Sequence, residues 1–311
     1  MARTRHPLLH PRQIEAIVTV ARAGSVHAAA RLLHIPQPAL SRLIAASEKS
    51  LGVALFERSR AGTRPTEAGE RVLKQGAFAL QALQGVAESA RESLPVVRLG
   101  CIPRVMHVLI PHLLAQLSND DAGFRLHVSV GTSNELAGDL DAARLDFVIA
   151  RRAAPGVVAA PDLQAEKLYS ERTAVVCGRS NRDVQTGSSP VRVRDLVALP
   201  WVLPKRGFHS RDLLDGIVAA HGLPPIVPVI ESNSFESSLS MVAWTRFLTL
   251  APEFAARRFE QLRLVRLIAM RPTLGSSPIM LEYRRIQQQH PAFPAFRASV
   301  LRATRQIHAG A

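Results

Sequence analysis

The 311-residue chain has only two cysteines, few aromatic residues and no long uncharged hydrophobic run. Cys101 and Cys177 are too few for a disulfide framework, and no Cys-x-x-Cys pattern indicates structural zinc. The most apolar stretch, residues 241–252, contains Arg246 and is too short to span a bilayer. The first residues contain no apolar segment long enough for a secretory signal. We therefore expect a cytoplasmic protein without a membrane-spanning segment.

Sequence signatures of common enzymes are also absent. The chain contains no Gly-x-Ser-x-Gly, no phosphate-loop pattern, no His-Glu-x-x-His and no dinucleotide fingerprint. His107 and His112 are five residues apart, which places them on different faces of a helix rather than together as metal ligands. We expect neither a bound metal nor a cofactor. An enzyme is nevertheless the main alternative class, because two-lobed α/β proteins also catalyse reactions.

Acidic residues are scarce relative to basic ones, and the net charge is +14. Arginine supplies nearly all of the positive charge, which could also reflect the composition of the source genome. The distribution is more informative than the total. Residues 1–66 hold ten Lys and Arg against three Glu, a net charge of +7 and half of the total. A basic N-terminal module before a more neutral body is typical of a DNA-binding head.

The N-terminal 66 residues have the pattern of a winged helix-turn-helix. Apolar residues at helical spacing predict a first helix that ends at Ala23-Gly24, and Ser25 is placed to cap a second. A break at His34-Ile35-Pro36 precedes a third helix over residues 37–50. The basic segment 55–65, with Gly62 in its turn, predicts a small β-wing.

The third helix is the candidate recognition helix, since Gln37, Ser41 and Arg42 project from its outer face. Glutamine can bond adenine, arginine can bond guanine or phosphate, and serine suits either kind of contact. Pro38 lies in the first turn, where its missing N–H costs nothing. The alternative is a solvated helix face that contacts nothing.

A long helix is predicted from Thr66 to residue 94. Its apolar residues alternate in steps of three and four, as in a heptad seam: Leu73, Gly76, Leu80, Leu83, Ala87, Ala90 and Leu94. We expect this helix to pair with a second copy of the chain, because both neighbouring regions look complete without it. Packing along its own chain is the alternative.

From Pro95 onward strands alternate with helices, which indicates a parallel-sheet α/β body large enough for two lobes. Segments 150–161 and 271–278, rich in Arg, Pro, Gly and Ser, are the expected crossings between lobes. The predicted domains are a winged helix-turn-helix (1–66), a linker helix (67–94) and an effector domain (95–311). Its first lobe covers about 95–155 and 278–305, and its second about 162–271.

Residues 12–71 resemble the DNA-binding head of LysR-type transcriptional regulators. The matching runs are Gly24-Ser25-Val26, Ala28-Ala29-Ala30, Gln37-Pro38-Ala39-Leu40-Ser41, Leu51-Gly52-Val53-Ala54-Leu55-Phe56-Glu57-Arg58 and Thr66-Glu67-Ala68-Gly69. The body resembles the same family through Leu99-Gly100, Leu145-Asp146-Phe147 and His221-Gly222-Leu223-Pro224. Two positions depart from the family pattern: Ser47 replaces an apolar residue, and His27 stands where threonine is common.

The resemblance implies a winged helix-turn-helix, a dimerising linker helix and an effector domain of two α/β lobes like those of periplasmic binding proteins. Such regulators are usually homotetramers that bind interrupted palindromes in double-stranded DNA, respond to a small inducer and can contact RNA polymerase. The DNA-binding residues that it implies are Ser25, Gln37, Pro38, Ser41, Arg42, Arg58, Arg60 and Arg64. Gln37, Pro38, Ser41 and Arg42 would lie in the major groove.

The α/β pattern predicts a ligand site beyond the carboxyl ends of the strands, beside helix N-termini. Candidate residues follow the first two strands and come from loops of the opposite lobe: Ile102, Pro103, Arg104, Thr132, Ser133, Asn134, Lys205, Ser232 and Ser234. Arg104 could bind a carboxylate through two hydrogen bonds. We therefore expect an organic acid as effector, with a neutral ligand as the alternative. The alternatives to effector binding are that Arg104 points to solvent and that Ser234 only caps a helix.

Cys101 lies after a predicted strand, where a thiol could sense an oxidant. A small buried residue is the other interpretation of this position. Another class of function is an architectural DNA-binding protein whose body only assembles subunits.

Overall fold

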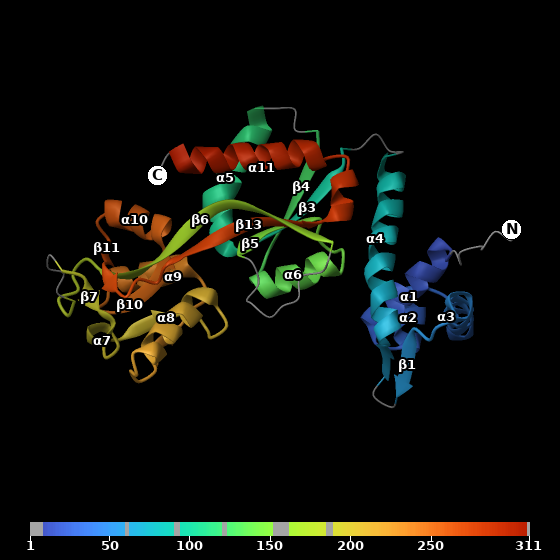
Figure 1. The fold of residues 1–311 in the computed structure, drawn as a ribbon, viewed down its shortest axis with the longest axis horizontal. Coiled ribbons are helices and arrows are strands. Elements are labelled where there is room, and N and C mark those ends of the chain that lie inside the picture. The colour runs from blue at the N-terminus through green and yellow to red at the C-terminus, as the bar shows by residue number, and fades with distance from the viewer. Residues whose placement is uncertain are drawn as a thin grey trace.

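The computed structural model describes residues 9–59, 62–89, 94–119, 123–151, 162–184 and 189–309. A helical head and the long helix α4 lie at one end of an elongated molecule, and a two-lobed α/β body lies at the other (Figure 1).

The head is a bundle of three short helices. These are α1 (Pro11–Ala23), α2 (Val26–Leu32) and α3 (Gln37–Leu51). The Ser25 hydroxyl accepts a hydrogen bond from the Ala28 N–H at 3.2 Å, which confirms the predicted cap of α2. Ser47, the polar departure in the core, is fully buried and donates to the Leu43 carbonyl at 2.7 Å. The hydroxyl is therefore satisfied within its own helix.

The wing consists of β1 (Phe56–Ser59) and β2 (Gly62–Pro65), which pair antiparallel. Gly62 has φ +123°, and a Cβ atom there would lie 2.8 Å from the Gly24 carbonyl oxygen. The next residue, Thr63, donates its N–H to the same oxygen at 2.9 Å. Glycine is therefore required where the wing meets the turn between α1 and α2.

Helix α4 (Glu67–Ser89) begins at Thr66, whose hydroxyl accepts the Gly69 N–H at 3.0 Å. Its first half packs on the head: a Cβ at Gly76 would lie 2.9 Å from Cγ2 of Ile14. That half of the predicted seam thus faces its own chain. Further along, the Leu83 side chain is 43 % exposed. Of the remaining seam positions, Ala90 and the Ala87 side chain lie outside the described residues.

Lobe 1 is a sheet covered by helices and is built from both ends of the body. Its elements are β3 (Val96–Cys101), α5 (Pro103–Asn119), β4 (Arg125–Val130), α6 (Ser133–Asp141), β5 (Phe147–Arg151), β13 (Ser276–Arg284), η1 (Arg285–Gln289) and α11 (Phe293–Ala309). β3 pairs parallel with β4 and β5, whereas β13 is antiparallel to β5. Phe147 and Phe296 pack at the centre with ring centroids 4.6 Å apart.

Lobe 2 has the same layered construction. Its elements are β7 (Val191–Arg192), α7 (Val193–Leu196), β8 (Trp201–Leu203), α8 (His209–Ala220), β9 (Ile230–Glu231), α9 (Phe235–Ala243), β10 (Leu248–Pro252), α10 (Glu253–Gln261), β11 (Val265–Ile268) and β12 (Met270–Arg271). β8 pairs parallel with β9 and β10. The buried Trp201 donates its indole N–H to the Leu196 carbonyl at 2.9 Å.

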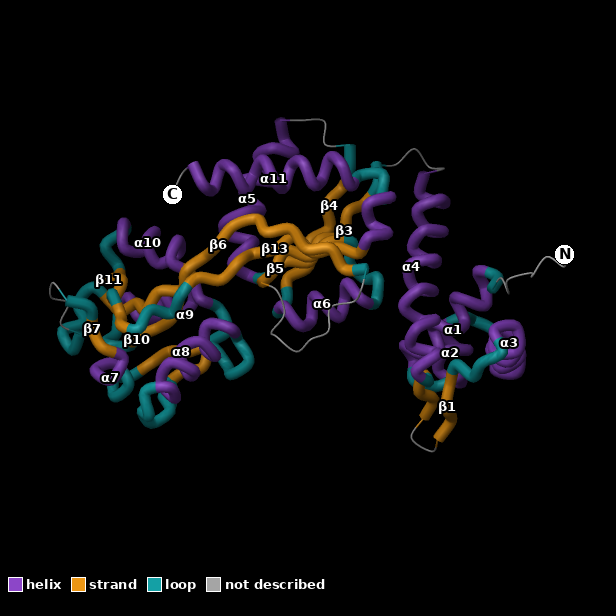
Figure 2. Tube along the Cα trace, in the orientation of Figure 1, coloured by secondary structure: helices purple, strands orange, loops and turns teal. Residues whose placement is uncertain are grey.

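One long strand, β6 (Leu163–Gly178), belongs to both lobes. Figure 2 shows β6 and β13 running side by side across the body. Residues 163–172 pair with β13 in lobe 1, and residues 173–177 pair with β10 in lobe 2. The outward crossing therefore lies at Thr173, inside a strand, and not in the predicted segment 150–161. Residues 152–161 of that segment lie outside the described part.

The parallel pairing expected of the body occurs in both lobes, but each lobe also contains antiparallel pairs. β6 and β13 are antiparallel to each other, and β10 and β11 are both antiparallel to β6. The sheet is mixed because the chain crosses between lobes along paired strands. β9 is short and covers only Ile230–Glu231.

Candidate functional site

The N-terminal turn of α3 presents the predicted DNA-contacting side chains. Leu40 and Ile44 are buried in the head core, which directs Gln37 and Arg42 to the exposed side. Ser41 is half-buried beside them. Pro38 occupies the first turn of the helix, as expected. The surface is therefore polar, basic and carried on a rigid helix.

His27 on α2 contacts the first residue of the recognition helix. Its Nδ1 lies 3.3 Å from Oε1 of Gln37, and both side chains are exposed. A hydrogen bond here fixes one end of the Gln37 carboxamide. His27 was noted in the sequence only as a departure from the family pattern, and this contact was not foreseen.

The remaining predicted DNA-binding residues flank α3. Arg64 is exposed on β2. Arg58 lies on β1 opposite Thr63, but its side chain, like all of Arg60, is outside the described part of the structure. The half-buried Ser25 uses its hydroxyl as the cap of α2.

A cavity of about 550 Å³ lies between the two lobes. Seven of the nine residues predicted for the effector line it: Ile102, Pro103, Arg104, Thr132, Ser133, Asn134 and Ser232. Lys205 and Ser234 are not among the lining residues. Ser234 instead caps α9 by accepting the Ser237 N–H at 3.1 Å, which is its alternative role.

Five helices begin at the cavity wall. Residues at the starts of α5 and α6 in lobe 1, and of α8, α9 and α10 in lobe 2, all contribute to the lining. Each start carries the positive end of a helix dipole. Part of this capacity is already used, because Thr132 donates both its N–H and its hydroxyl to Oε2 of Glu135, each at 2.8 Å. Because five helix N-termini meet at the cavity, it is favourable for a negatively charged group.

Two arginines stand in the lobe 1 wall. Arg104 is buried and its Nη1 lies 2.5 Å from Oε2 of the buried Glu171. Arg151, at the end of β5, was not predicted as a site residue. Burial lowers the pKa of Arg151 to about 9, and the charge of Arg104 adds to that effect. The strand end that carries Arg151 was expected to be a crossing segment, which is why sequence reasoning missed it.

Lobe 2 contributes a histidine that was also not predicted, with aromatic rings beside it. His209, at the start of α8, is 2.6 Å from Oγ of Ser277 through Nε2. Burial, together with the charges of Arg151 and Arg104, lowers the pKa of His209 to about 4, so the ring is neutral at neutral pH. Phe208 and Phe235 supply apolar surface to the same cavity.

The lobes also touch directly across the cleft. His107 on α5 forms an ion-pair contact through Nε2 with Glu236 on α9, and its ring meets that of Phe235 edge-on at 5.2 Å. This contact links the two walls beside the cavity. His107 is thus an inter-lobe contact residue.

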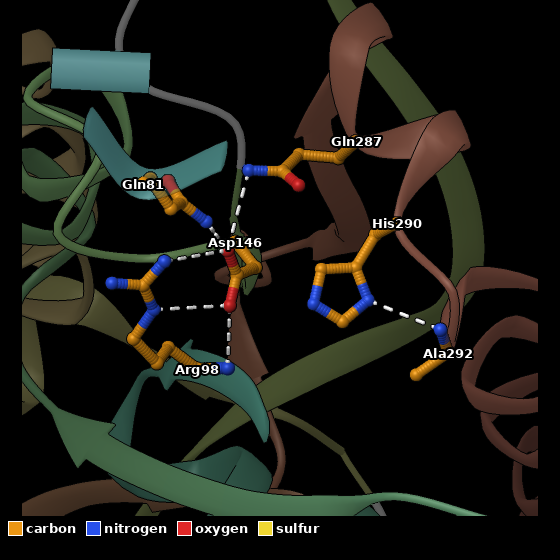
Figure 3. A network of polar contacts seen from close by, with 6 residues as sticks. All are labelled: Gln81, Arg98, Asp146, Gln287, His290 and Ala292. Carbon is orange, nitrogen blue, oxygen red and sulfur yellow. Dashed lines mark hydrogen bonds and ion pairs between the residues drawn. The ribbon is translucent and has the colours of Figure 1, made fainter. Parts of the chain in front are cut away.

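Helix α4 is joined to lobe 1 by the network in Figure 3, which centres on Asp146. The fully buried Asp146 accepts hydrogen bonds from the Arg98 N–H at 2.7 Å, from Nη2 of Arg98 at 3.1 Å and from Nε2 of Gln287 at 3.2 Å. Gln81 of α4 donates to the same carboxylate. Polar contacts therefore connect the linker helix to the core of lobe 1.

A second contact lies one turn below Gln81. The guanidinium of Arg284 lies over the ring of Phe78 in α4, with Cζ 4.5 Å from the ring centroid. Arg284 is itself buried and paired with Asp162 at 2.7 Å. Both contacts join the linker helix to parts of lobe 1 that come from distant points in the sequence.

Cys101 is fully buried, and burial raises the pKa of its thiol to about 12. A thiol in that state is protonated at neutral pH, which favours the interpretation as a packing residue. Among the residues that the structure describes, no group of three or more His, Cys, Asp or Glu is arranged to hold a metal. No helix within the described ranges has the length and apolar character needed to cross a membrane.

A basic helix-turn-helix head, a linker helix and a two-lobed domain with a cavity between its lobes define a ligand-responsive DNA-binding regulator. Family comparisons agree with this class. The family of bacterial regulatory helix-turn-helix proteins of lysR type matches residues 11–70, and the LysR substrate binding domain matches residues 90–305. The chain belongs to the LysR family of DNA-binding transcriptional regulators, which are not enzymes.

Individual relatives agree with this assignment. The transcriptional regulator GbpR of Azospirillum brasilense is 30 % identical over 80 % of this chain and 73 % of its own length. The regulator PcaQ of Agrobacterium fabrum is 31 % identical, with 72 % of each chain covered. The crystal structure of ArgP from Mycobacterium tuberculosis superposes with a TM-score of 0.73 over 96 % of this chain and 97 % of its own, at 18 % identity. ArgP therefore shows the same fold.

Proposed function

We propose that this LysR-type regulator responds to an organic acid bound in the cavity between its lobes. The observation that carries the proposal is the accumulation of positive potential there. Five helix N-termini and three arginines, Arg104, Arg151 and Arg206, line the cavity against one lining carboxylate, Asp212, and aromatic and aliphatic side chains lie among them. An acid with an apolar body matches both features.

The DNA proposal places the start of α3 in the major groove. Gln37, Ser41 and Arg42 would contact base edges, with Pro38 at the groove wall. The residues proposed to flank them along the backbone are Ser25, Arg58, Arg60 and Arg64. A specific test is Arg42→Ala, which we expect to cost about 1–3 kcal/mol on the cognate site and little on random DNA. Equal losses on both, in titrations at fixed salt, would assign Arg42 to a phosphate contact.

We propose that the chain dimerises through α4 and that dimers associate as tetramers. The half of α4 beyond the head supports this, because Leu83 is exposed there. Two heads at a fixed separation would then read an interrupted palindrome. Sedimentation that showed a lone chain at micromolar concentration would contradict the proposal.

In the proposed mechanism, the acid favours one arrangement of the lobes through its differential affinity. Lobe 1 passes that arrangement to α4 through Gln81 and Phe78, which contact Asp146 and Arg284. The helix would thereby alter the spacing of the heads on DNA and their approach to RNA polymerase. We place this activity in the cytoplasm, where the DNA is.

A paired measurement tests the function. Unfolding temperature and calorimetry would be recorded with organic acids and with their neutral amides, because a ligand that prefers the folded state raises its stability. DNA fragments selected from the source genome would then be footprinted with and without the stabilising acid. We expect stabilisation by acids alone and an altered footprint. A preferred DNA site with no response to any acid would instead indicate an architectural protein.

A further inference from the structure

The two arginines of the lobe 1 wall differ in their electrostatic surroundings. Arg104 is paired with Glu171, at 2.5 Å between Nη1 and Oε2, and the two side chains are 10 % and 7 % exposed. Its charge is therefore compensated inside the protein. An effector anion would have to compete with Glu171 for Arg104.

Arg151 has no such partner. Its Nε and Nη1 atoms are buried, and neither finds a hydrogen-bond partner within the described part of the chain. Burying a guanidinium with unsatisfied N–H groups is costly, so such a site favours the arrival of an acceptor. Because Arg151 also lines the cavity, that acceptor can come from a bound molecule.

The other polar groups around Arg151 do not supply the missing charge. Tyr169 is buried with its hydroxyl likewise unpartnered among the described residues, and burial raises its pKa, so it is neutral. His209 is neutral as well, because its pKa is lowered to about 4. Two cationic guanidiniums thus face the single carboxylate of Glu171. One positive charge remains uncompensated in this wall.

We infer that Arg151, rather than Arg104, binds the anionic group of the effector, and that Glu171 limits the site to one negative charge by neutralising Arg104. The inference rests on the proposed function, an acid in this cavity. Arg151 can hold a carboxylate through two parallel N–H donors. The body of the acid then meets Ile102, Phe208 and Leu250. The ligand class is a monocarboxylic acid with an apolar or aromatic body.

The first experiment compares Arg151→Met with the wild-type full-length chain. Binding of benzoate, phenylacetate, hexanoate and lactate, each against its neutral amide, is measured by calorimetry at millimolar concentrations. We expect at least one acid to bind the wild type more tightly than its amide does, and Arg151→Met to weaken that acid about 10- to 100-fold. Binding of the amide should change little. The unfolding temperature without ligand controls for folding.

Arg104 needs a matched control, because Arg104→Met alone would release Glu171 to pair with Arg151. The double variant Arg104→Met/Glu171→Gln removes the ion pair and leaves the charge of Arg151 in place. We expect it to bind the selected acid nearly as the wild type does. Loss of binding in this double variant, together with retained binding in Arg151→Met, would assign the anion to Arg104.

The single variant Glu171→Gln tests the limit of one charge. It releases Arg104, so the wall gains a second uncompensated guanidinium. We expect phthalate to gain affinity relative to benzoate by about tenfold or more, as an added charge-assisted hydrogen bond allows. An unchanged ratio would contradict the role given to Glu171.

The acid effector and the assignment of Arg151 are contradicted by different results. If no acid in the panel binds the wild type more tightly than its amide does, the proposed acid effector is wrong, and the assignment of Arg151 is wrong with it. If an acid binds the wild type and Arg151→Met equally well, only the assignment of Arg151 is overturned.

Discussion

Lobe 1 contains two charged side chains, Asp146 and Arg151, that differ in how many of their polar atoms are hydrogen-bonded. Asp146 is a carboxylate surrounded by N–H donors from Arg98, Gln287 and Gln81. Arg151 is a guanidinium whose Nε and Nη1 have no acceptor in the described structure. A buried charge that is fully hydrogen-bonded holds parts of a fold together, whereas one left incomplete is a place for a ligand. The difference predicts opposite consequences of removing each charge.

The largest expected effect comes from Asp146→Ala. It leaves the N–H groups of Arg98 and Gln287 without their acceptor inside the protein, so we expect a loss of about 3–5 kcal/mol in the free energy of unfolding. Urea denaturation measures it. Asp146→Asn, which keeps the shape but removes the charge, should lose less. A neutral result for the alanine variant would show that the Asp146 network does not stabilise lobe 1.

Removing the charge of Arg151 should change the free energy of unfolding in the opposite direction. Without acid, Arg151→Met removes a half-buried guanidinium with two buried, unsatisfied N–H groups, and it should raise the free energy of unfolding by about 1–2 kcal/mol. The same denaturation experiment detects it, with Arg206→Met, on the exposed rim of the cavity, as control. Destabilisation by Arg151→Met would indicate that the guanidinium is already satisfied in the free protein, and the comparison with Asp146 would fail.

A smaller effect is expected where the Asp146 network meets the linker. Gln81→Ala removes one of several donors to Asp146 and should cost about 1 kcal/mol in stability. Its effect on signalling should be the larger one, because α4 loses a contact with lobe 1. We expect DNA binding to persist while the acid no longer changes the footprint. Gln75→Ala, at an exposed position on the same helix, serves as control.

The smallest effect concerns the head. His27→Ala releases the carboxamide of Gln37 without touching the cores of either lobe. We expect about 0.5 kcal/mol less affinity for the cognate site, as for one exposed hydrogen bond, and a weaker preference at the base that Gln37 contacts. Binding to a set of single-base operator variants measures both. A uniform loss across all variants would mean that His27 acts on the phosphate backbone.

The head could be predicted almost completely because its signals are local. The cap at Ser25 and the proline in the first turn of α3 each act within a few residues. The inward positions of α3 follow from helical periodicity in the same way. His27 was the exception, since its contact with Gln37 depends on how α2 and α3 pack together.

The body was predicted in outline, but its decisive residues were not. Residues 163–172 were not identified as a strand because Lys167, Glu166 and Glu171 interrupt any simple apolar alternation. Both carboxylates find arginine partners from distant segments: Arg297 for Glu166 at 2.7 Å and Arg104 for Glu171. The ion pair that neutralises Arg104 spans 67 residues of sequence. Only the folded chain shows which arginine keeps an uncompensated charge.

The paired strands that cross the body have a consequence for modularity. Arg172 and Ser276 are direct partners across the β6–β13 ladder, and all of lobe 2 lies between them in sequence. Lobe 2 is therefore, in topology, a guest inserted at the tip of a β-hairpin whose two arms belong to the host lobe. A short turn could replace residues 173–275 and close that hairpin. Such an excision would leave a one-lobed chain carrying Arg151 but no opposing cavity wall.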